Sequence, residues 1–188
     1  QTVTVCVGLD LTVTKTATAS KDRLYKWLID KSVDDTLIEI ADGGTATFNY
    51  DVLVTPDGYT EDGFTLGGTI TIVNPNDWQA ITVDVSDTLD AGGTCTITEA
   101  APYVVPASGQ LDLNYTCTTD GTTTKNTVDV TWNAATYFTP TGSASDDAAV
   151  TFAVDQETNE VITVIDDKTD PLHPVTLGTW DWNDGAHT

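Results

Sequence analysis

VTVCVGLDLTVTKTA, residues 3–17, contains two runs of apolar residues alternating with threonine, separated only by Gly8-Leu9-Asp10. Successive side chains of a β-strand point to opposite faces, so this alternation predicts two half-buried strands. The same pattern, rich in Thr and Val, recurs along most of the chain. We expect strands at 2–7, 11–18, 24–33, 45–55, 65–73, 80–86, 94–98, 110–117, 127–132, 149–154 and 160–165.

Turn signals rich in Gly, Pro, Asp and Asn separate these runs, for example TPDG (55–58), EDG (61–63) and ASG (107–109). Only residues 34–41 have a pattern that also fits a short helix. Many short strands at this spacing predict an all-β fold, an antiparallel Greek-key β-sandwich of the immunoglobulin-like type. Strand parity predicts that the core contains the following residues: Tyr25, Trp27, Ile29 and Val33; Ala46, Phe48, Tyr50, Val52 and Val54; Ile81, Val83 and Val85; Val128, Val130 and Trp132.

The composition is strongly acidic, with 29 Asp and Glu against 7 Lys and Arg and a formal net charge of −22. Such a charge repels nucleic-acid phosphates and anionic lipids, so we expect neither as a partner. The sequence also has no apolar run near the length that a membrane span needs.

Catalytic motifs are absent from the sequence. The two histidines, His173 and His187, both lie near the C-terminus, and there is no nucleophile elbow or phosphate-binding loop. We therefore predict that the protein is not an enzyme and needs no organic cofactor.

The chain has three cysteines without metal-binding spacing. Cys95 and Cys117 each share strand parity with apolar neighbours, so both are expected to point inward on neighbouring strands. A disulfide between them would place the protein in an oxidising, extracellular compartment. The alternative is two buried thiols in a reducing cell. Cys6 is left over, as an unpaired or an intermolecular cysteine.

Five stretches resemble the conserved repeat domains of bacterial and archaeal secreted surface proteins: DLTVTKTATAS (10–20), GTITIVNPN (68–76), VDVSDTL (83–89), GGTCTIT (92–98) and NTVDVTW (126–132). The resemblance covers roughly residues 10–155, with an inserted aromatic loop at 130–150 that the family pattern lacks. It implies extracellular β-sandwich modules arranged in tandem, which serve in stalks, fibres and adhesive surfaces rather than as enzymes.

The resemblance also suggests a domain division. Residues 1–9 would be the closing strand of an adjacent module or a donor strand, 10–155 a complete sandwich, and 156–188 the opening strands of a second, incomplete sandwich. One explanation is that a longer tandem array has been cut. The other is that strand 2–7 of one copy completes the sheet of the next, which gives a head-to-tail filament of a structural subunit.

A lysine, an acid and an asparagine with inward parity resemble the intramolecular isopeptide arrangement of bacterial surface adhesins. The residues are Lys31, Asp87 and Asn126, with Lys15 as a second candidate for the lysine because it matches the family's Lys-Thr motif. Burial would free a neutral amine to attack the amide, while a protonated acid polarises the carbonyl. The alternative is a partly exposed lysine paired with a carboxylate.

Two ligand hypotheses remain. Acidic clusters offer the oxygen ligands that calcium prefers, with Asp166, Asp167 and Asp170 as the favoured site, although such clusters are usually solvated surface. As an alternative to a purely structural function, aromatic side chains outside the predicted core could bind glycans. These aromatics are Tyr59, Trp78, Tyr137 and Phe138.

Overall fold

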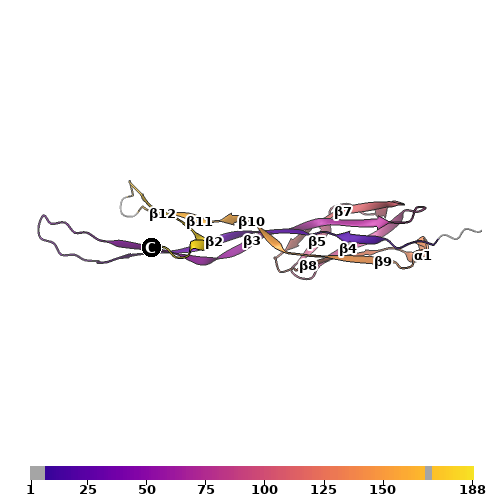
Figure 1. Cartoon of the computed structure of the whole chain (residues 1–188), viewed down its shortest axis with the longest axis horizontal. Helices are drawn as coiled ribbons and strands as arrows, with labels where there is room; N and C mark the ends of the chain where they lie inside the picture. Colours follow the sequence, from indigo (N-terminus) through magenta and orange to yellow (C-terminus); the bar gives the residue numbers. More distant parts are fainter. Residues whose placement is uncertain (1–6, 168–170) are drawn as a thin grey trace, which may run out of the picture. The chain divides into compact units, whose positions relative to one another are not determined.

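The computed structural model describes residues 7–167 and 171–188 and has an all-β architecture with antiparallel sheets (Figure 1). No helix within these ranges is long and apolar enough to cross a bilayer. The elements are β1 (Thr12–Lys15), β2 (Thr18–Val33), β3 (Tyr50–Asn74), β4 (Ile81–Leu89), β5 (Gly93–Ile97), β6 (Tyr103–Val105), β7 (Gly109–Thr119), β8 (Lys125–Thr131), α1 (Ala134–Tyr137), β9 (Ser143–Ala149), β10 (Phe152–Thr158), β11 (Val161–Asp166), β12 (Val175–Asp181) and a 3-10 turn, η1 (Trp182–Asp184).

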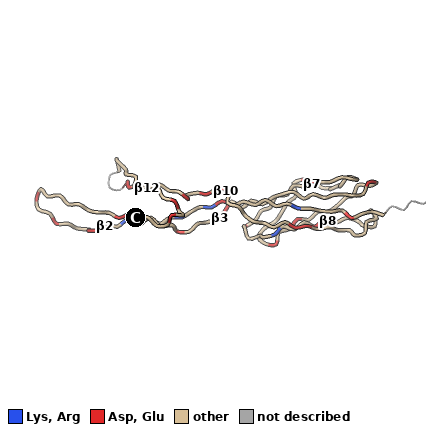
Figure 2. Tube along the Cα trace, in the orientation of Figure 1, with Lys and Arg blue, Asp and Glu red and all other residues tan. Residues whose placement is uncertain are grey.

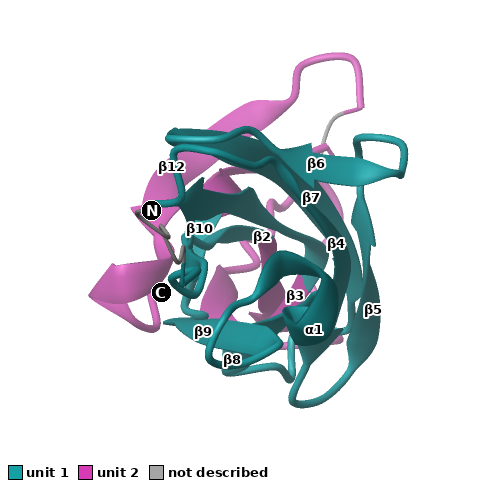
Figure 3. Ribbon diagram, turned by 90° about the vertical axis from the view of Figure 1, so that its right-hand side faces the viewer, with its two compact units in different colours: residues 1–21, 62–154 teal, residues 22–61, 155–188 magenta. Residues whose placement is uncertain are grey.

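The chain divides into two compact units, coloured separately in Figure 3. Unit 1 comprises residues 1–21 and 62–154, and unit 2 comprises residues 22–61 and 155–188. This division differs from the predicted complete domain at 10–155, because residues 22–61 fold with the C-terminal segment instead. Alternation reveals that a strand has two faces, but it does not reveal which other strands it joins.

Unit 1 contains the larger core. Strand β3 pairs with both β1 and β7, and β5 continues this sheet beyond β7, while a second sheet has the order β6-β4-β8-β9. Side chains from both sheets form one apolar cluster, because alternate residues of each strand face it. The cluster consists of Leu11, Ala19, Leu66, Ile70, Ile72, Ile81, Val83, Val105, Leu113, Tyr115, Cys117, Val128, Val130, Trp132 and Val150.

Unit 2 is much less well packed. Its β11 and β12 pair with each other, and Val54 of β3 exchanges backbone hydrogen bonds of 2.8 and 2.9 Å with His187. Among its described residues only Tyr25, Val54 and Val164 are buried. The described residues of the C-terminal segment belong to the same compact unit as residues 22–61. The predicted inward positions Ile29, Phe48 and Tyr50 are wrong, since they are 58%, 39% and 52% exposed.

Turns were expected at 55–58 and 61–63, but β3 runs without a break through both. Gly58 and Gly63 have φ angles of 74° and 61°, which the strand accommodates as local irregularities rather than reversals. Residues 34–41 contain no helix. The Gly- and Asp-containing stretches 55–58 and 61–63 therefore correspond to distortions within one long strand and not to the ends of strands.

The N-terminal segment is attached to unit 1 from Gly8 onward. The Gly8 amide donates to the carbonyl of Phe138 (2.9 Å), and the Leu9 backbone exchanges two hydrogen bonds with the Asn76 side chain (2.7 and 2.8 Å). Most of the predicted strand 2–7, including Cys6, lies outside the described residues.

Candidate functional site

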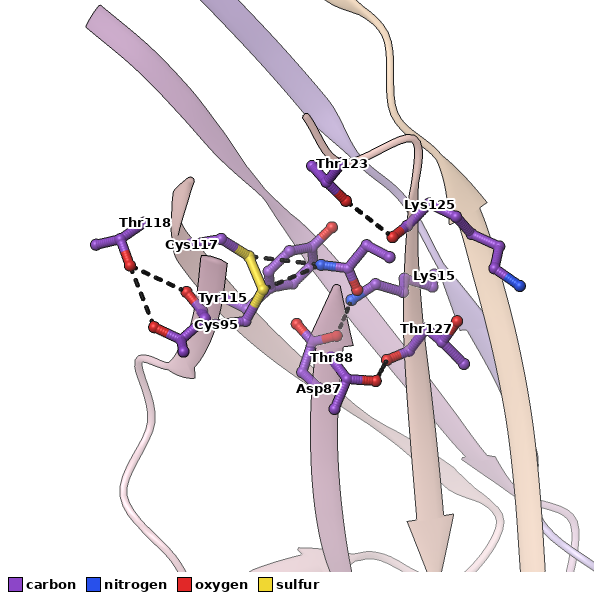
Figure 4. The surroundings of a disulfide bond; sticks show 12 residues. Lys15, Asp87, Thr88, Cys95, Tyr115, Cys117, Thr118, Thr123, Lys125 and Thr127 are labelled. Atoms are coloured by element: carbon purple, nitrogen blue, oxygen red, sulfur yellow. Dashed lines mark hydrogen bonds and ion pairs between the residues drawn. A yellow bond between two sulfur atoms is a disulfide. The ribbon is translucent and has the colours of Figure 1, made fainter. Parts of the chain in front are cut away.

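The predicted disulfide between Cys95 and Cys117 is confirmed. The two cysteines lie directly opposite each other on β5 and β7, with Cα atoms 4.0 Å apart (Figure 4). Antiparallel partners of this kind bring their side chains close together on one face of the sheet. The bond ties β5 to β7 next to a group of buried polar residues.

Lys15 and Asp87 form the centre of that group. Lys15 Nζ lies 2.8 Å from Asp87 Oδ1, and the two side chains are only 0% and 1% exposed. Lys15 is the last residue of β1, and Asp87 is on β4 in the other sheet. Moving two charges out of water is costly, so a pair this deep is unusual unless the protein uses it.

The ring of Tyr115 covers the lysine amine from the other side. Lys15 Nζ is 3.4 Å from the ring centre, and the Tyr115 hydroxyl donates a 2.6 Å hydrogen bond to the carbonyl of Thr16. The backbone amide of Lys15 donates to Asp146 Oδ2 at 2.7 Å. These contacts fix both the backbone and the side chain of Lys15.

Asn126 completes the group and is fully buried. Its Nδ2 donates to the sulfurs of Cys95 (3.2 Å) and Cys117 (3.4 Å), which are weak acceptors. Asp87 pairs in register with Val128, and Asn126 with the residue two beyond Asp87. Asp87 and Asn126 are therefore diagonal neighbours on the same face of the β4–β8 pair.

Two oxygens of this group accept no hydrogen bond, Oδ2 of Asp87 and Oδ1 of Asn126. A buried acceptor without a partner costs about 1–3 kcal/mol of stability. Both atoms are acceptors when Asp87 is ionised. A proton on Asp87 would turn one of them into a donor.

The direction of the pKa shift at Asp87 favours the protonated carboxylic acid. Burial raises the pKa of Asp87, against the opposing effects of Lys15 and of the Asn126 amide. Burial likewise lowers the pKa of Lys15, against its hydrogen bond and attraction to Asp87. Both shifts favour the uncharged forms, which a single proton transfer from Lys15 to Asp87 produces. The site can therefore hold a neutral amine beside a carboxylic acid and an amide.

The prediction that Lys31 faces this group is wrong. Lys31 belongs to unit 2, where its side chain is 30% exposed and lies 2.9 Å from Asp166 Oδ2. The second candidate, Lys15, takes the position instead. A signal was available in the sequence, because Lys15 shares strand parity with the apolar residues Leu11, Val13 and Ala17.

Asp87, Cys95 and Cys117 place potential ligand atoms within 4.8 Å of one another. Metal ligation by cysteine requires the thiolate, and both sulfurs are already joined in the disulfide. This group is therefore not a metal site in its oxidised form. Of the predicted calcium ligands, Asp166 bonds to Lys31 and Asp170 lies outside the described residues.

The four candidate glycan-binding aromatics do not share one unit. Tyr59 lies in unit 2, with the guanidinium of Arg23 4.3 Å from its ring centre. Trp78, Tyr137 and Phe138 lie in unit 1, where Gln79 Nε2 donates to the Tyr137 carbonyl at 2.6 Å. Trp78 and Phe138 are 46% and 67% exposed.

Acidic residues outnumber basic ones in both units, and Figure 2 marks the two kinds along the backbone trace. Comparison with known proteins found no matching protein-family model, no matching curated protein and no matching solved structure.

Proposed function

We propose that this protein is a structural module of an extracellular filament or stalk, with an immunoglobulin-like Greek-key unit 1 and a unit 2 that is completed by β-structure of a neighbouring copy. The observation that carries this proposal is the unequal burial of the two units. Unit 1 has a continuous core, whereas the described part of unit 2 buries three residues.

Unit 2 exposes many apolar side chains on its strands. Single exposed apolar residues are ordinary, but a concentration of them on one unit is typical of an interaction surface. The two-stranded β11–β12 sheet also has backbone groups available for further pairing along its edges, within the described residues. The exposed apolar residues, each 41% or more exposed, are Leu28, Ile29, Tyr50, Leu53, Tyr59, Val161, Ile165, Val175 and Leu177.

The disulfide and the acidic surface fit an extracellular setting. A disulfide persists in oxidising compartments, and a large net charge of one sign keeps an exposed assembly soluble. The resemblance to secreted repeat domains over residues 10–155 supports the same proposal. Strand pairing between copies would be opposed by the charge of −22, so salt should promote it.

Sedimentation velocity of the full chain over a series of protein and salt concentrations tests the proposal. We expect association that increases with salt, and elongated particles in negative-stain electron microscopy. Val161→Lys on β11 should weaken association. Val104→Lys is the matched control, because Val104 is a similarly exposed valine (45%) on β6 of unit 1. A chain that stays monomeric under all conditions, or equal effects of the two substitutions, would contradict the proposal.

Glycan binding is a second candidate, favoured by a polar hollow of about 460 Å³ in unit 1. Tyr137 lines it together with Asp84 and Asn133, and polar groups beside an aromatic ring are typical of sugar sites. A glycan array with the full chain tests this function. Binding that is lost in Tyr137→Ala but kept in Tyr59→Ala would support it, and an array without hits would exclude it for the glycans tested.

A further inference from the structure

The buried polar group of unit 1 has a composition that simple packing does not require. Lys15, Asp87 and Asn126 come from three strands, β1, β4 and β8, and the lysine and carboxylate side chains are almost completely excluded from solvent. Asn126 is fully buried, yet its carbonyl oxygen has no hydrogen-bond partner. A stable ion pair between Lys15 and Asp87 would need no asparagine beside it.

We propose that Lys15 and Asn126 become joined by an intramolecular isopeptide bond, with Asp87 acting as the acid–base group. The inference does not depend on assembly of the chain, because all three residues belong to unit 1.

The contacts place the three groups in one small buried space. Lys15 Nζ is 2.8 Å from Asp87 Oδ1, and Asp87 is the diagonal neighbour of Asn126 on one face of the β4–β8 pair. The same two disulfide sulfurs lie within 4.8 Å of an Asp87 oxygen and within 3.4 Å of Asn126 Nδ2. Figure 4 shows the Lys15 side chain directed at Asp87, beside the disulfide.

The chemistry balances without any further reactant. Lys15 passes a proton to Asp87, and its neutral amine forms a bond to Cγ of Asn126. Protonated Asp87 donates a hydrogen bond to the unpartnered Oδ1 as negative charge develops there. It then gives its proton to Nδ2 and takes up the proton that the attacking Lys15 nitrogen must lose. The Cγ–Nδ2 bond breaks and ammonia leaves. An amine and a primary amide thus become a secondary amide and ammonia, with no oxidation or reduction.

The surroundings suit each step. Nδ2 donates to the two disulfide sulfurs, and sulfur is a weak acceptor, so little is lost when ammonia leaves. The burial that shifts both pKa values toward the uncharged forms also removes competing water. The product replaces a buried charge with a neutral amide. It also connects β1, which pairs with β3, to β8 of the other sheet.

Mass spectrometry of the full chain decides the matter. After reduction of the disulfide, we expect the intact mass to be lower than the sequence mass by one ammonia. Cyclisation of Gln1 also releases ammonia, so the bond must be located by peptide mapping. The expected product is a branched peptide joining Lys15 to Asn126, with trypsin unable to cleave after Lys15.

Variants identify the groups involved. Asn126→Ala and Asp87→Asn should each abolish the branched peptide, and Asp87→Asn should leave Lys15 and Asn126 both present and unmodified. Asp84→Asn is a matched control, because Asp84 is an exposed acid on the same strand, and Lys125→Arg is a second control beside Asn126. Both controls should retain the branched peptide in full.

Folded wild-type chain with unmodified Lys15 and Asn126 would overturn the proposal, as would a branched peptide that persists in Asp87→Asn. Folding is judged by formation of the Cys95–Cys117 disulfide and by near-ultraviolet circular dichroism. Should a variant fail to fold, the wild-type peptide map still gives the answer, and it does so whether or not the chain forms filaments.

Discussion

Lys15 on β1 and Tyr115 on β7 belong to strands that both pair with β3, and the lysine nitrogen is 3.4 Å from the centre of the tyrosine ring. The Tyr115 hydroxyl donates a 2.6 Å hydrogen bond to the backbone carbonyl of Thr16, the residue that follows Lys15. Tyr115 therefore both covers the amine and anchors the end of β1. This relationship holds the Lys15 side chain in a buried, fixed position.

Tyr115→Phe should keep the ring and remove the hydrogen bond to Thr16. We expect the free energy of unfolding to fall by about 1 kcal/mol, because the part-buried hydrogen bond from the tyrosine hydroxyl is lost. Tyr50→Phe is the control, since Tyr50 is 52% exposed, and its effect should be within about 0.5 kcal/mol. Urea denaturation measures both, and equal losses would contradict the role of the hydroxyl.

Gly68 of β3 is the place where the backbones of β1 and β3 leave no room for a side chain. A Cβ atom at this position would overlap the carbonyl oxygen of Thr16 and lie 2.9 Å from the Tyr115 hydroxyl. Gly68→Ala should therefore cost about 3 kcal/mol or more and displace β1. Gly58→Ala meets no atom within 4 Å and opposes only a φ of 74°, so it should cost about 1–2 kcal/mol. Thermal unfolding of the two variants measures these losses of stability, and equal losses would contradict the close approach of β1 at Gly68.

The disulfide between Cys95 and Cys117 closes a loop with a sequence separation of 22. The double substitution Cys95→Ala, Cys117→Ala should lower the free energy of unfolding by about 3 kcal/mol, because the unfolded chain regains the entropy of the open loop. A Cys6→Ser background prevents thiol exchange and serves as the reference. Unfolding midpoints that coincide with the reference would show that the bond contributes no stability.

The carboxylate of Asp90 accepts several hydrogen bonds, which make the stability of the fold depend on pH. Hydrogen bonds from the Thr123 and Thr124 hydroxyls, and from the backbone amides of Thr124 and Lys125, hold the pKa of Asp90 well below its usual value of 3.8. The folded state therefore binds a proton at Asp90 less readily than the unfolded state does. This contribution is fully present above about pH 4 and is lost as the pH falls through the folded-state pKa.

Asp90→Asn should accordingly melt at a lower temperature than wild type at pH 7, and the difference should shrink as the pH is lowered below 4. Asp84→Asn, which replaces an exposed acid of β4, is the control and should show a small, nearly constant difference. Thermal melts between pH 2 and 7 give the comparison. A difference that stays constant over the whole range would argue against the proposed donors.

Part of the buried core could be predicted from the alternation of apolar residues within individual strands. In 81–85 and 128–132, alternate apolar residues are buried or partly buried, as their parity predicts, and the inward parity of Cys95 and Cys117 identified the disulfide. Asp87 and Asn126 were identified as members of the candidate site in the same way. These predictions succeeded because each depends on the side-chain period of a strand, which is a local property.

The sequence by itself determined that this protein is all-β, strongly acidic and able to form one internal disulfide. Only the tertiary structure decided that Lys15, and not Lys31, lies beside Asp87, and that residues 22–61 fold with the C-terminal segment. The physical reason is that strands pair through backbone groups that every residue carries. Alternation along a strand therefore fixes which side chains share a face, while packing between distant segments selects the neighbouring strand.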